Sequence, residues 1–378
     1  MVPIQQLFQL MHSKSASDMF LSVKAPIHLK INGDLVPVNP HKLESAEVMT
    51  LLSEVVPQRD MQRLAEENEL NIGIPVSGVG RFRLSAFCQR GSISAVFRFI
   101  PSVIPDLDSL KLPPVLSELI MERNGLILVV GATGSGKSTT IASMLDKRNE
   151  LRTGHILTLE DPIEYLFRSK KSIVNQREIG TDTESLQIGL KNALRQAPDC
   201  ILIGEIRDKS TMTEAIAYAQ AGHLVVATLH ANNSYHALNR IISFYPLENR
   251  QALLQDISSS LRAIISQRLV RSNNGQRTPA VEVMRNTQYI SELIEKGELE
   301  EIRSAVERSL SPGSQTFEQA LIQMIKSGVI TRDEGVAFAD SASNLLWQLN
   351  NNSEIVQVPQ QKKKKEDGPT FTEFTMNV

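Results

Sequence analysis

A glycine-rich segment of eight residues, 131–138, constrains the fold of this chain more than any other feature. Its sequence, GATGSGKS, matches the pattern G-x-x-x-x-G-K-[ST] of a phosphate-binding loop. The apolar run 126–130 before it predicts a buried parallel strand, and the spacing of Ile141, Met144 and Leu145 after it predicts a helix. Strand, glycine-rich loop and helix in this order form the context in which such a loop binds phosphates.

This loop predicts a site for a nucleoside triphosphate. Its backbone N–H groups can close around phosphate oxygens, and the N-terminus of the following helix adds a positive dipole end. We expect Lys137 to reach the β- and γ-phosphates and the Ser138 hydroxyl to ligate Mg²⁺. The residues assigned to nucleotide binding are Gly131, Ala132, Thr133, Gly134, Ser135, Gly136, Lys137, Ser138 and Thr139. A glycine-rich turn before an ordinary helix is the alternative, which the Gly-Lys-Ser ending and both flanks disfavour.

Composition sets the class of the protein. A length of 378 residues predicts two or three domains, and 41% apolar with 22% charged residues is typical of a soluble globular protein. The formal net charge of −2 offers no overall basic field, so we expect no nucleic-acid partner. The only cysteines, Cys88 and Cys200, lie in apolar runs and are interpreted as two buried thiols of a cytosolic protein. Without a signal peptide or an apolar run of membrane-spanning length, membrane association is expected only through a partner.

Residues 1–100 predict a small α/β domain, and the proline-bearing segment 101–116 predicts a semi-rigid linker. The elements expected in the small domain are an amphipathic opening segment, strands at 19–23, 27–31, 81–87 and 92–100, and a helical stretch at 44–65. The last two strands are expected to form a hairpin.

Residues 117–350 predict a second domain, because apolar strand runs alternate there with helical patterns, as in a parallel sheet covered by helices. The strand runs lie at 126–130, 156–159, 201–203 and 224–229. After about residue 245 the pattern is interpreted as helical, with Leu253, Ile257, Leu261, Ile264 and Ile265 on one face. The end, 351–378, predicts a disordered polar tail, whose four lysines at 362–365 are interpreted as solvated rather than as a binding site.

Two acidic segments follow the loop at the ends of predicted strands. The segment 160–164 follows the run 156–159, at the carboxyl edge where α/β sheets bind ligands. The run 201–203 is followed by Gly-Glu, a Walker B arrangement that places Glu205 near the metal and the attacking water. Carboxylates at these places could orient water or hold Mg²⁺. For the first segment, an acidic turn that caps a helix is the alternative.

His223 and His230 bracket the strand run 224–229. Their spacing puts the two rings on opposite faces of a strand, which is a poor zinc chelate even with His236 as a third ligand. Nucleotide sensing or an interface contact is therefore favoured over a metal site.

Three arginines lie on the outer face of the predicted hairpin. Arg81 and Arg83 alternate with Phe82. On the partner strand, Arg98 lies on the face that does not carry the apolar side chains. They form either a solvated surface or an anion clamp. We favour a clamp that reaches a phosphate across a domain or subunit boundary, as arginine fingers do.

Four segments in this order resemble the Walker A, Asp, Walker B and His boxes of the secretion ATPase superfamily. They are GATGSGKST, TLEDPIEYL, LIGEIRD and GHLVVATLHANN. More narrowly, residues 16–297 resemble the type IV pilus retraction ATPases, the PilT/PilU group. The stretches SASDMFLSVKAPIHLKINGDL, GRFRLSAF and VNQREIG share in this resemblance.

The resemblance implies an α/β fold, with a PAS-like N-terminal domain joined to a RecA-like P-loop ATPase domain with C-terminal helices, assembled as a ring hexamer. It implies a Mg²⁺-dependent ATPase that powers or assists pilus retraction. The implied site comprises catalytic Glu164, Glu205 and Lys137, metal-binding Ser138 and Glu205, and nucleotide-contacting Arg81, Arg83, Arg98, His223 and His230. The implied partners are a PilT-like ATPase and the inner-membrane platform protein of the pilus machine, at whose cytoplasmic side the ring would lie.

One departure from the group lies at residues 289–296. PilT carries AIRNLIRE where this chain has YISELIEK, so that two arginines are replaced by Ser291 and Glu295. This local reversal of charge, with the lysine-bearing tail, points to the accessory (PilU) branch. It leaves open whether the protein acts alone or only beside a PilT-like ATPase. Ala132 replaces a common proline, with little expected consequence.

Other functions remain as alternatives. A regulatory subunit that binds ATP and tunes a partner motor fits the altered segment 289–296. A RecA-like nucleic-acid translocase shares the predicted fold, but near-neutral charge without aromatic and basic interleaving disfavours it. Extension motors of the superfamily commonly carry a tetracysteine zinc site, which two cysteines cannot supply.

Overall fold

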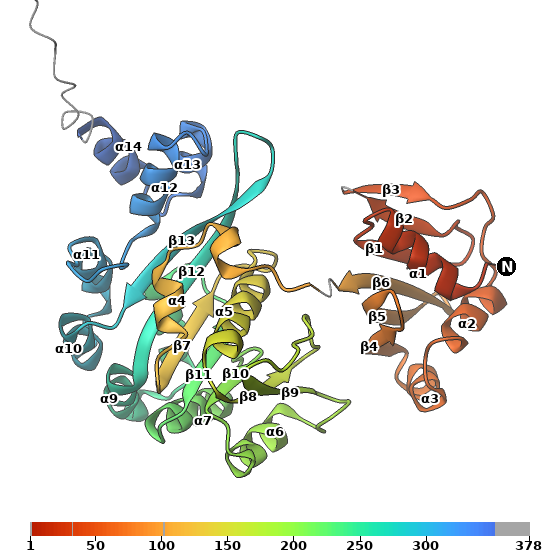
Figure 1. Ribbon diagram of the computed structural model, residues 1–378, viewed down its shortest axis with the longest axis horizontal. Coiled ribbons are helices and arrows are strands. Elements are labelled where there is room, and N and C mark those ends of the chain that lie inside the picture. The colour runs from red at the N-terminus through yellow and green to blue at the C-terminus, as the bar shows by residue number, and fades with distance from the viewer. Residues whose placement is uncertain (1, 32, 101–102, 352–378) are drawn as a thin grey trace, which may run out of the picture.

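The computed structural model describes residues 2–31, 33–100 and 103–351, which form two β-sheets, each with its own helices (Figure 1). The predicted tail, 351–378, lies outside the described residues except for Asn351. In the described ranges, no helix combines the length and the apolar character needed to cross a membrane.

The N-terminal sheet is antiparallel at every pairing of its six strands. Its strands are β1 (Asp18–Leu21), β2 (His28–Ile31), β3 (Asp34–Pro37), β4 (Glu69–Val76), β5 (Gly80–Gln89) and β6 (Ser92–Ile100), in the order β3-β2-β1-β6-β5-β4. Its helices are α1 (Ile4–Ser13), α2 (Ser45–Ser53) and α3 (Gln58–Glu67). The predicted hairpin is confirmed as β5 and β6. The single helical stretch predicted at 44–65 is two helices, because Pro57 interrupts one and starts the next.

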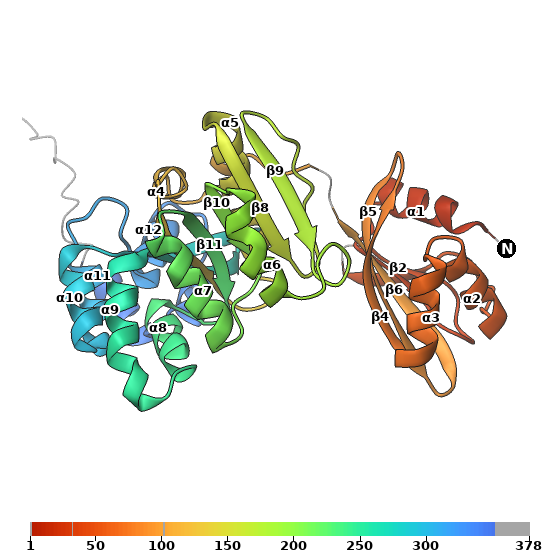
Figure 2. The ribbon, with the colours of Figure 1, turned by 90° about the horizontal axis from the view of Figure 1, so that it is seen from below.

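Only one face of this sheet holds the apolar core. The ring of Phe8 from α1 stacks on Phe82 of β5 at a centroid distance of 4.1 Å and meets Phe97 of β6 edge-on at 5.2 Å. Helices α1, α2 and α3 cover the side that points away from the second sheet (Figure 2). The opposite face, with Arg81 and Arg83, is therefore turned toward the second sheet.

The second sheet is parallel except at its edge strand β13. Its strands are β7 (Gly125–Val130), β8 (Gly154–Glu160), β9 (Ser172–Glu178), β10 (Cys200–Ile203), β11 (Leu224–Leu229), β12 (Leu261–Arg271) and β13 (Arg277–Arg285), in the order β13-β12-β7-β11-β10-β8-β9. In chain order, the helices that accompany these strands are α4 (Val115–Leu119), α5 (Lys137–Leu151), α6 (Leu186–Ala193), α7 (Lys209–Gln220), α8 (Ser234–Ser243) and α9 (Arg250–Ser260). All four strand runs predicted for a parallel sheet are confirmed.

The helical interpretation is wrong between residues 261 and 285, where the chain forms the strands β12 and β13. Leu261, Ile264 and Ile265 lie in β12, which pairs in parallel with β7 and antiparallel with β13. The helix α9 ends at Ser260, so only Leu253 and Ile257 of the predicted helical face are helical. A short apolar run fits either period, and here pairing with a buried neighbouring strand decides the outcome.

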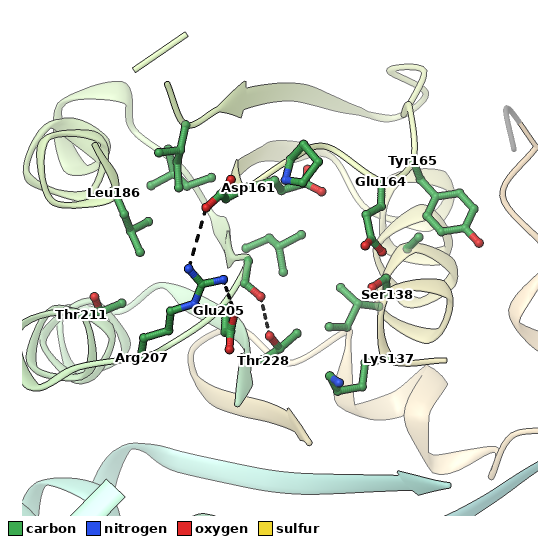
Figure 3. Close-up of a pocket in the computed structure, with 18 of the residues that line it drawn as sticks. Lys137, Ser138, Asp161, Glu164, Tyr165, Leu186, Glu205, Arg207, Thr211 and Thr228 are labelled. Carbon is green, nitrogen blue, oxygen red and sulfur yellow. Dashed lines mark hydrogen bonds and ion pairs between the residues drawn. The ribbon is translucent and has the colours of Figure 1, made fainter. Parts of the chain in front are cut away.

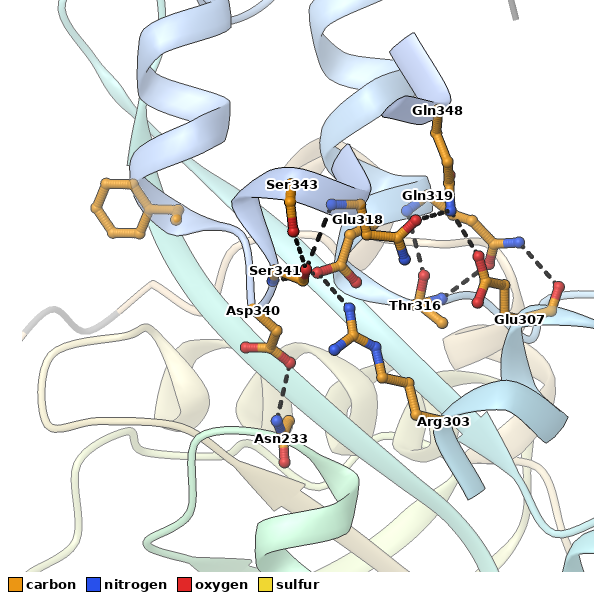
Figure 4. A network of polar contacts seen from close by, with 12 residues as sticks. Asn233, Arg303, Glu307, Thr316, Glu318, Gln319, Asp340, Ser341, Ser343 and Gln348 are labelled. Carbon is orange, nitrogen blue, oxygen red and sulfur yellow. Dashed lines mark hydrogen bonds and ion pairs between the residues drawn. The ribbon is translucent and has the colours of Figure 1, made fainter. Parts of the chain in front are cut away.

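Five helices end the described chain, as predicted: α10 (Gln288–Lys296), α11 (Ile302–Glu307), α12 (Phe317–Lys326), α13 (Arg332–Phe338) and α14 (Ala342–Asn351). A polar network attaches the last three to the sheet domain (Figure 4). Arg303 of α11 is paired with Glu318 of α12 at 2.8 Å, and Glu318 also accepts the backbone N–H of Ser341 at 2.9 Å. The amide of Asn233, at the start of α8, donates to Asp340 at 2.8 Å.

The segment 101–116 is not extended throughout. Residues 101–102 lie outside the described residues, and Leu107–Leu110 form the short 3-10 helix η1. Leu107, Val115 and Leu116 are buried in the apolar cluster beneath the second sheet. The later part of the segment is therefore packed on that sheet. Removing these three apolar side chains from water stabilises this packing.

The interpretation of both cysteines as buried is wrong for Cys88. Cys200 is completely buried in β10, whereas Cys88 is exposed near the end of β5. Cys88 is on the same face as Phe82 and Leu84, but β5 extends beyond the edge of the core there, and Phe87 is also exposed.

We expect a maleimide to modify Cys88 and not Cys200 in the native protein. Burial removes Cys200 from the reagent and raises the pKa of its thiol to about 11, so that its reactive thiolate is suppressed. Intact-mass measurement should show one adduct on the native chain and two after unfolding in guanidinium. A native Cys88→Ser variant should take up none, and two rapid adducts on the native wild type would contradict the burial of Cys200.

Candidate functional site

The glycine-rich loop connects β7 to α5 in the predicted way. Gly134 and Gly136 have φ of 78° and 90°, in the left-handed region that favours glycine. A Cβ on Gly136 would lie 2.7 Å from the side-chain nitrogen of Gln267 in β12. Gln267 also accepts a hydrogen bond from the Thr140 hydroxyl at 2.7 Å. The loop is therefore braced from below by β12, with the N-terminus of α5 open to a ligand.

Polar groups in the loop are arranged for an anion. The ammonium of Lys137 donates to the carbonyls of Gly131 and Ala132 at 2.8 and 3.0 Å, so it lies across the loop. The hydroxyl of Ser135 is buried without a hydrogen-bond partner. A buried donor without an acceptor is costly, and a phosphate oxygen would supply the acceptor. Burial lowers the pKa of Lys137, while the charges of Glu205 and Glu164 oppose that shift.

A cavity of about 490 Å³ opens beside this loop (Figure 3), within the usual range for a ligand site. Of the loop residues assigned to nucleotide binding, Thr133, Gly134, Lys137 and Ser138 line it. Glu164 and Glu205 line it as well, which brings the three predicted catalytic residues together. Thr139 instead shares a hydrogen bond of 2.9 Å with the hydroxyl of Tyr165.

Glu205 is held by two cationic or polar partners. Arg207 contacts its carboxylate at 2.6 Å, and the ring of His230 lies 2.9 Å from the other carboxylate oxygen. His230 thus reaches the cavity from the end of β11. Arg207 also lines the cavity, 3.9 Å from Asp161. Arg207 was not predicted as a site residue, although it lies in the Walker B segment.

Glu160 and Glu164 differ in their surroundings. Glu160 is buried, accepts hydrogen bonds from Thr158 at 2.7 Å and Gln176 at 3.2 Å, and has its pKa raised by burial. Glu164 faces the cavity on the side of Ser138 (Figure 3). Glu160 therefore supports the loop after β8, whereas Glu164 is available to a ligand.

The three hairpin arginines share a face but have different partners. Arg83 and Arg98 are register neighbours on β5 and β6, as the alternation predicted. Arg83 lines the cavity, so it crosses from the N-terminal sheet to the nucleotide site within one chain. Arg98 is paired with Asp18 at 2.8 Å, and Arg81 is paired with Glu178. The structure thus brings one of the three to the cavity.

His223 is not brought to this cavity. It precedes β11 at the opposite end from His230, and its ring nitrogen lies 3.2 Å from the carbonyl oxygen of Tyr218. His236 bonds the Asn233 side chain at 2.8 Å. Among the described residues, no group of three histidine, cysteine, aspartate or glutamate side chains could hold a metal ion.

Comparison with known proteins places this geometry in a family. A family model described as Type II/IV secretion system protein matches residues 2–334. The chain belongs to this family. The Type IV pilus ATPase PilU of Pseudomonas aeruginosa is 44% identical over 351 residues, which cover 93% of this chain and 92% of PilU. PilT of the same organism, described as a Type IV pilus retractation ATPase, is 37% identical over 330 residues, 87% of this chain and 96% of PilT.

Solved structures extend the similarity to the fold. The crystal structure of the pilus retraction motor PilT with bound ADP matches with a TM-score of 0.86 and 38% identity, covering 92% of this chain and 100% of that chain. The ATPase DotB of Legionella pneumophila matches with a TM-score of 0.77 and 26% identity, covering 88% and 93%. The resemblance to the PilT/PilU group inferred from the four boxes is confirmed, and so is the α/β fold of a PilT-like ATPase.

We expect nucleotide affinity to decline with rising pH earlier than at a site with an ordinary lysine. Lys137 is fully protonated well below its pKa and loses its charge as the pH rises through that pKa. Burial lowers the pKa, so the charge is lost at a lower pH. Glu205→Gln removes a charge that raises the pKa, so the decline should move to still lower pH. Calorimetric titration with ADP over the alkaline range measures both profiles. Lys137→Arg, charged throughout, is the control, and identical profiles for wild type and Glu205→Gln would contradict this electrostatic coupling.

Proposed function

We propose that this chain is a Mg²⁺-dependent ATPase motor that powers or assists the retraction of type IV pili. The observation that carries this proposal is one cavity lined by Lys137 and Ser138 from the phosphate loop and by Glu164 and Glu205 from two neighbouring strand ends. The 44% identity to PilU and the fold of PilT support pilus retraction as the process served.

The cavity residues divide the chemistry of ATP hydrolysis between them. The loop N–H groups and Lys137 bind the phosphates and fix the γ-phosphate in position. Ser138, with Glu205 through water, would hold Mg²⁺, which neutralises charge on the phosphates when bound. The carboxylate of Glu164 or Glu205 orients the attacking water and accepts its proton. Arg83 adds a cation where negative charge spreads in the transition state.

Motor function needs the two sheets to move relative to each other. We assign residues 1–100 to a PAS-like domain, 101–116 to a linker and 117–350 to a RecA-like ATPase domain with C-terminal helices. Six copies would form a ring that hydrolyses ATP at its subunit interfaces, with each turnover changing the angle between the domains. The ring would lie on the cytoplasmic side of the inner membrane, beneath the pilus platform protein.

An accessory role beside a PilT-like ATPase is the second candidate, and helix α10 favours it. Ser291 is turned inward and donates to the carbonyl of Ser258 at 3.0 Å, whereas Glu295 is exposed. The charge reversal at Glu295 therefore lies on the surface, where it changes the charge that this face presents to a partner protein. His223, remote from the cavity of its own chain, would serve at an interface in such an assembly.

Glu205→Gln should lower the ATP turnover of the purified protein by about a hundredfold or more, the loss expected of a catalytic carboxylate. Binding of ATP should persist, because the phosphate loop is intact. Lys137→Ala should lose both binding and turnover. Phosphate release and equilibrium binding of a fluorescent ATP analogue measure the two effects. The exposed Glu184 provides the matched control as Glu184→Gln, and wild-type turnover in Glu205→Gln would exclude this site.

Turnover measured with and without a purified PilT-like ATPase separates the two candidates. An autonomous motor hydrolyses ATP alone, and the Glu205→Gln substitution abolishes this activity. An accessory subunit gains turnover only when the catalytically dead partner is added, and Glu295→Arg should change that gain because it restores the charge found in PilT. Equal rates with and without the partner, in the wild type and in Glu295→Arg alike, would contradict the accessory role.

A further inference from the structure

The carboxylate of Glu178 joins the N-terminal sheet to the ATPase sheet beside the nucleotide cavity. Glu178 ends β9, in register with Glu160 at the end of β8. Its Oε2 is paired with the guanidinium of Arg81 in β5, and its Oε1 accepts the backbone N–H of Gly73 in β4 at 3.3 Å. Arg81 and Gly73 are therefore held by one residue of the other domain.

This contact is buried on both sides. The side chains of Arg81 and Glu178 are 13% and 4% exposed, and the Nε of Arg81 is buried without a partner. A buried charge is strongly unfavourable unless it is paired, so each of these residues determines where the other lies. A solvated surface pair would have no such consequence.

Gly73 makes room for the pair. A Cβ on Gly73 would lie 2.2 Å from a terminal nitrogen of the Arg81 guanidinium and 2.8 Å from its Cζ. The guanidinium therefore lies directly against the bare backbone of β4. Gly73 is not in the left-handed region, so its backbone accepts alanine, and the three atoms nearest to the added Cβ all belong to the guanidinium. We call Glu178, Arg81 and Gly73 the Glu178 clasp.

The clasp lies next to two segments that line the nucleotide cavity. Arg83, which lines the cavity, is two residues from Arg81 on the same strand face, about 7 Å away along an extended strand. On the other side, Glu178 Oε2 accepts the backbone N–H of Ile163 at 3.1 Å, and Glu164 follows directly. One carboxylate thus contacts the residue before Glu164 and the strand that carries Arg83.

We propose that Glu178 is a positioning residue whose clasp docks the N-terminal sheet at the nucleotide cavity and thereby sets Arg83 and Glu164 for hydrolysis. The kinetic consequence depends on the ATPase function proposed above, whereas the docking contact does not. Domain placement and turnover are therefore measured separately.

Two variants open the clasp from opposite sides. Glu178→Ala removes the carboxylate, and Gly73→Ala displaces the guanidinium without removing any charge or touching the ATPase sheet. Gly73→Ala keeps the test valid should Glu178→Ala fail to fold. The matched controls are Asn71→Ala, an exposed position on the same face of β4, and the exposed Glu184→Gln.

Domain placement is read by energy transfer between dyes on the exposed Cys88 and on a cysteine introduced by Ile173→Cys, which is 63% exposed in β9. Labelled chains are assembled with an excess of unlabelled chains, so that each ring reports on one subunit. Steady-state hydrolysis of ATP by the unlabelled variants gives kcat and KM separately.

Both clasp variants should lower the transfer efficiency and reduce kcat at least about tenfold, with a smaller change in KM because the phosphate loop is intact. Arg81→Ala combined with Glu178→Ala should be no worse than the more damaging single variant, because both remove the same contact. Both controls should match wild type.

Unchanged transfer efficiency in Gly73→Ala and Glu178→Ala would overturn the clasp, as would a double variant whose losses multiply. Reduced transfer efficiency in the clasp variants of a protein whose wild type shows no turnover, with or without the PilT-like partner, would instead support the docking role and reject the ATPase function.

Discussion

The common carboxyl edge of the parallel strands is the constraint on which the site depends. In the sheet register, Val130 of β7 is level with Leu229 of β11, and Ile203 of β10 is level with Leu159 of β8. Whatever follows these residues must therefore emerge on one side of the sheet. The phosphate loop, the two acidic segments and His230 follow them, so four segments far apart in the sequence meet at one cavity.

The chain itself brings charged groups of both signs to this cavity. Lys137, Arg83 and Arg207 supply cations, and the carboxyl groups around the same space belong to Glu160, Asp161, Glu164, Glu205 and Asp208. A bound triphosphate adds negative charge, which the loop N–H groups and cations can compensate. The N-terminal sheet contributes to this balance through Arg83. The position of that sheet therefore enters the chemistry, and the buried pair of Arg81 and Glu178 joins the two sheets in this structure.

Local sequence patterns predicted the parts of the structure that local physics decides. Apolar runs gave the central strands, and glycines followed by Lys137 gave the loop, because each pattern has few alternative conformations. Alternation gave the common face of Arg83 and Arg98. Glu205 was predicted from the apolar strand run and the glycine before it, and Glu164 from its place in the segment that resembles the Asp box.

The features that sequence reasoning missed are decided by tertiary contact. β9 carries mostly polar residues as an edge strand, and the run at 261–265 became a strand through pairing with β7. The pairing of Arg81 with Glu178 joins residues 97 positions apart, and no local pattern indicates it. Arg148 is a further case. Its side chain is buried, and its guanidinium donates hydrogen bonds to the carbonyls of Ile120 and Glu122, which only the fold brings near it.

A structure of the assembled protein with Mg²⁺ and a non-hydrolysable ATP analogue is the most direct test of this nucleotide site. We predict the triphosphate in the loop 131–138, with Lys137 against the γ-phosphate and the carboxylates of Glu164 and Glu205 facing the position of the attacking water. A nucleotide bound elsewhere, or both carboxylates turned away from the γ-phosphate, would contradict the assignment of this edge of the sheet as the catalytic site.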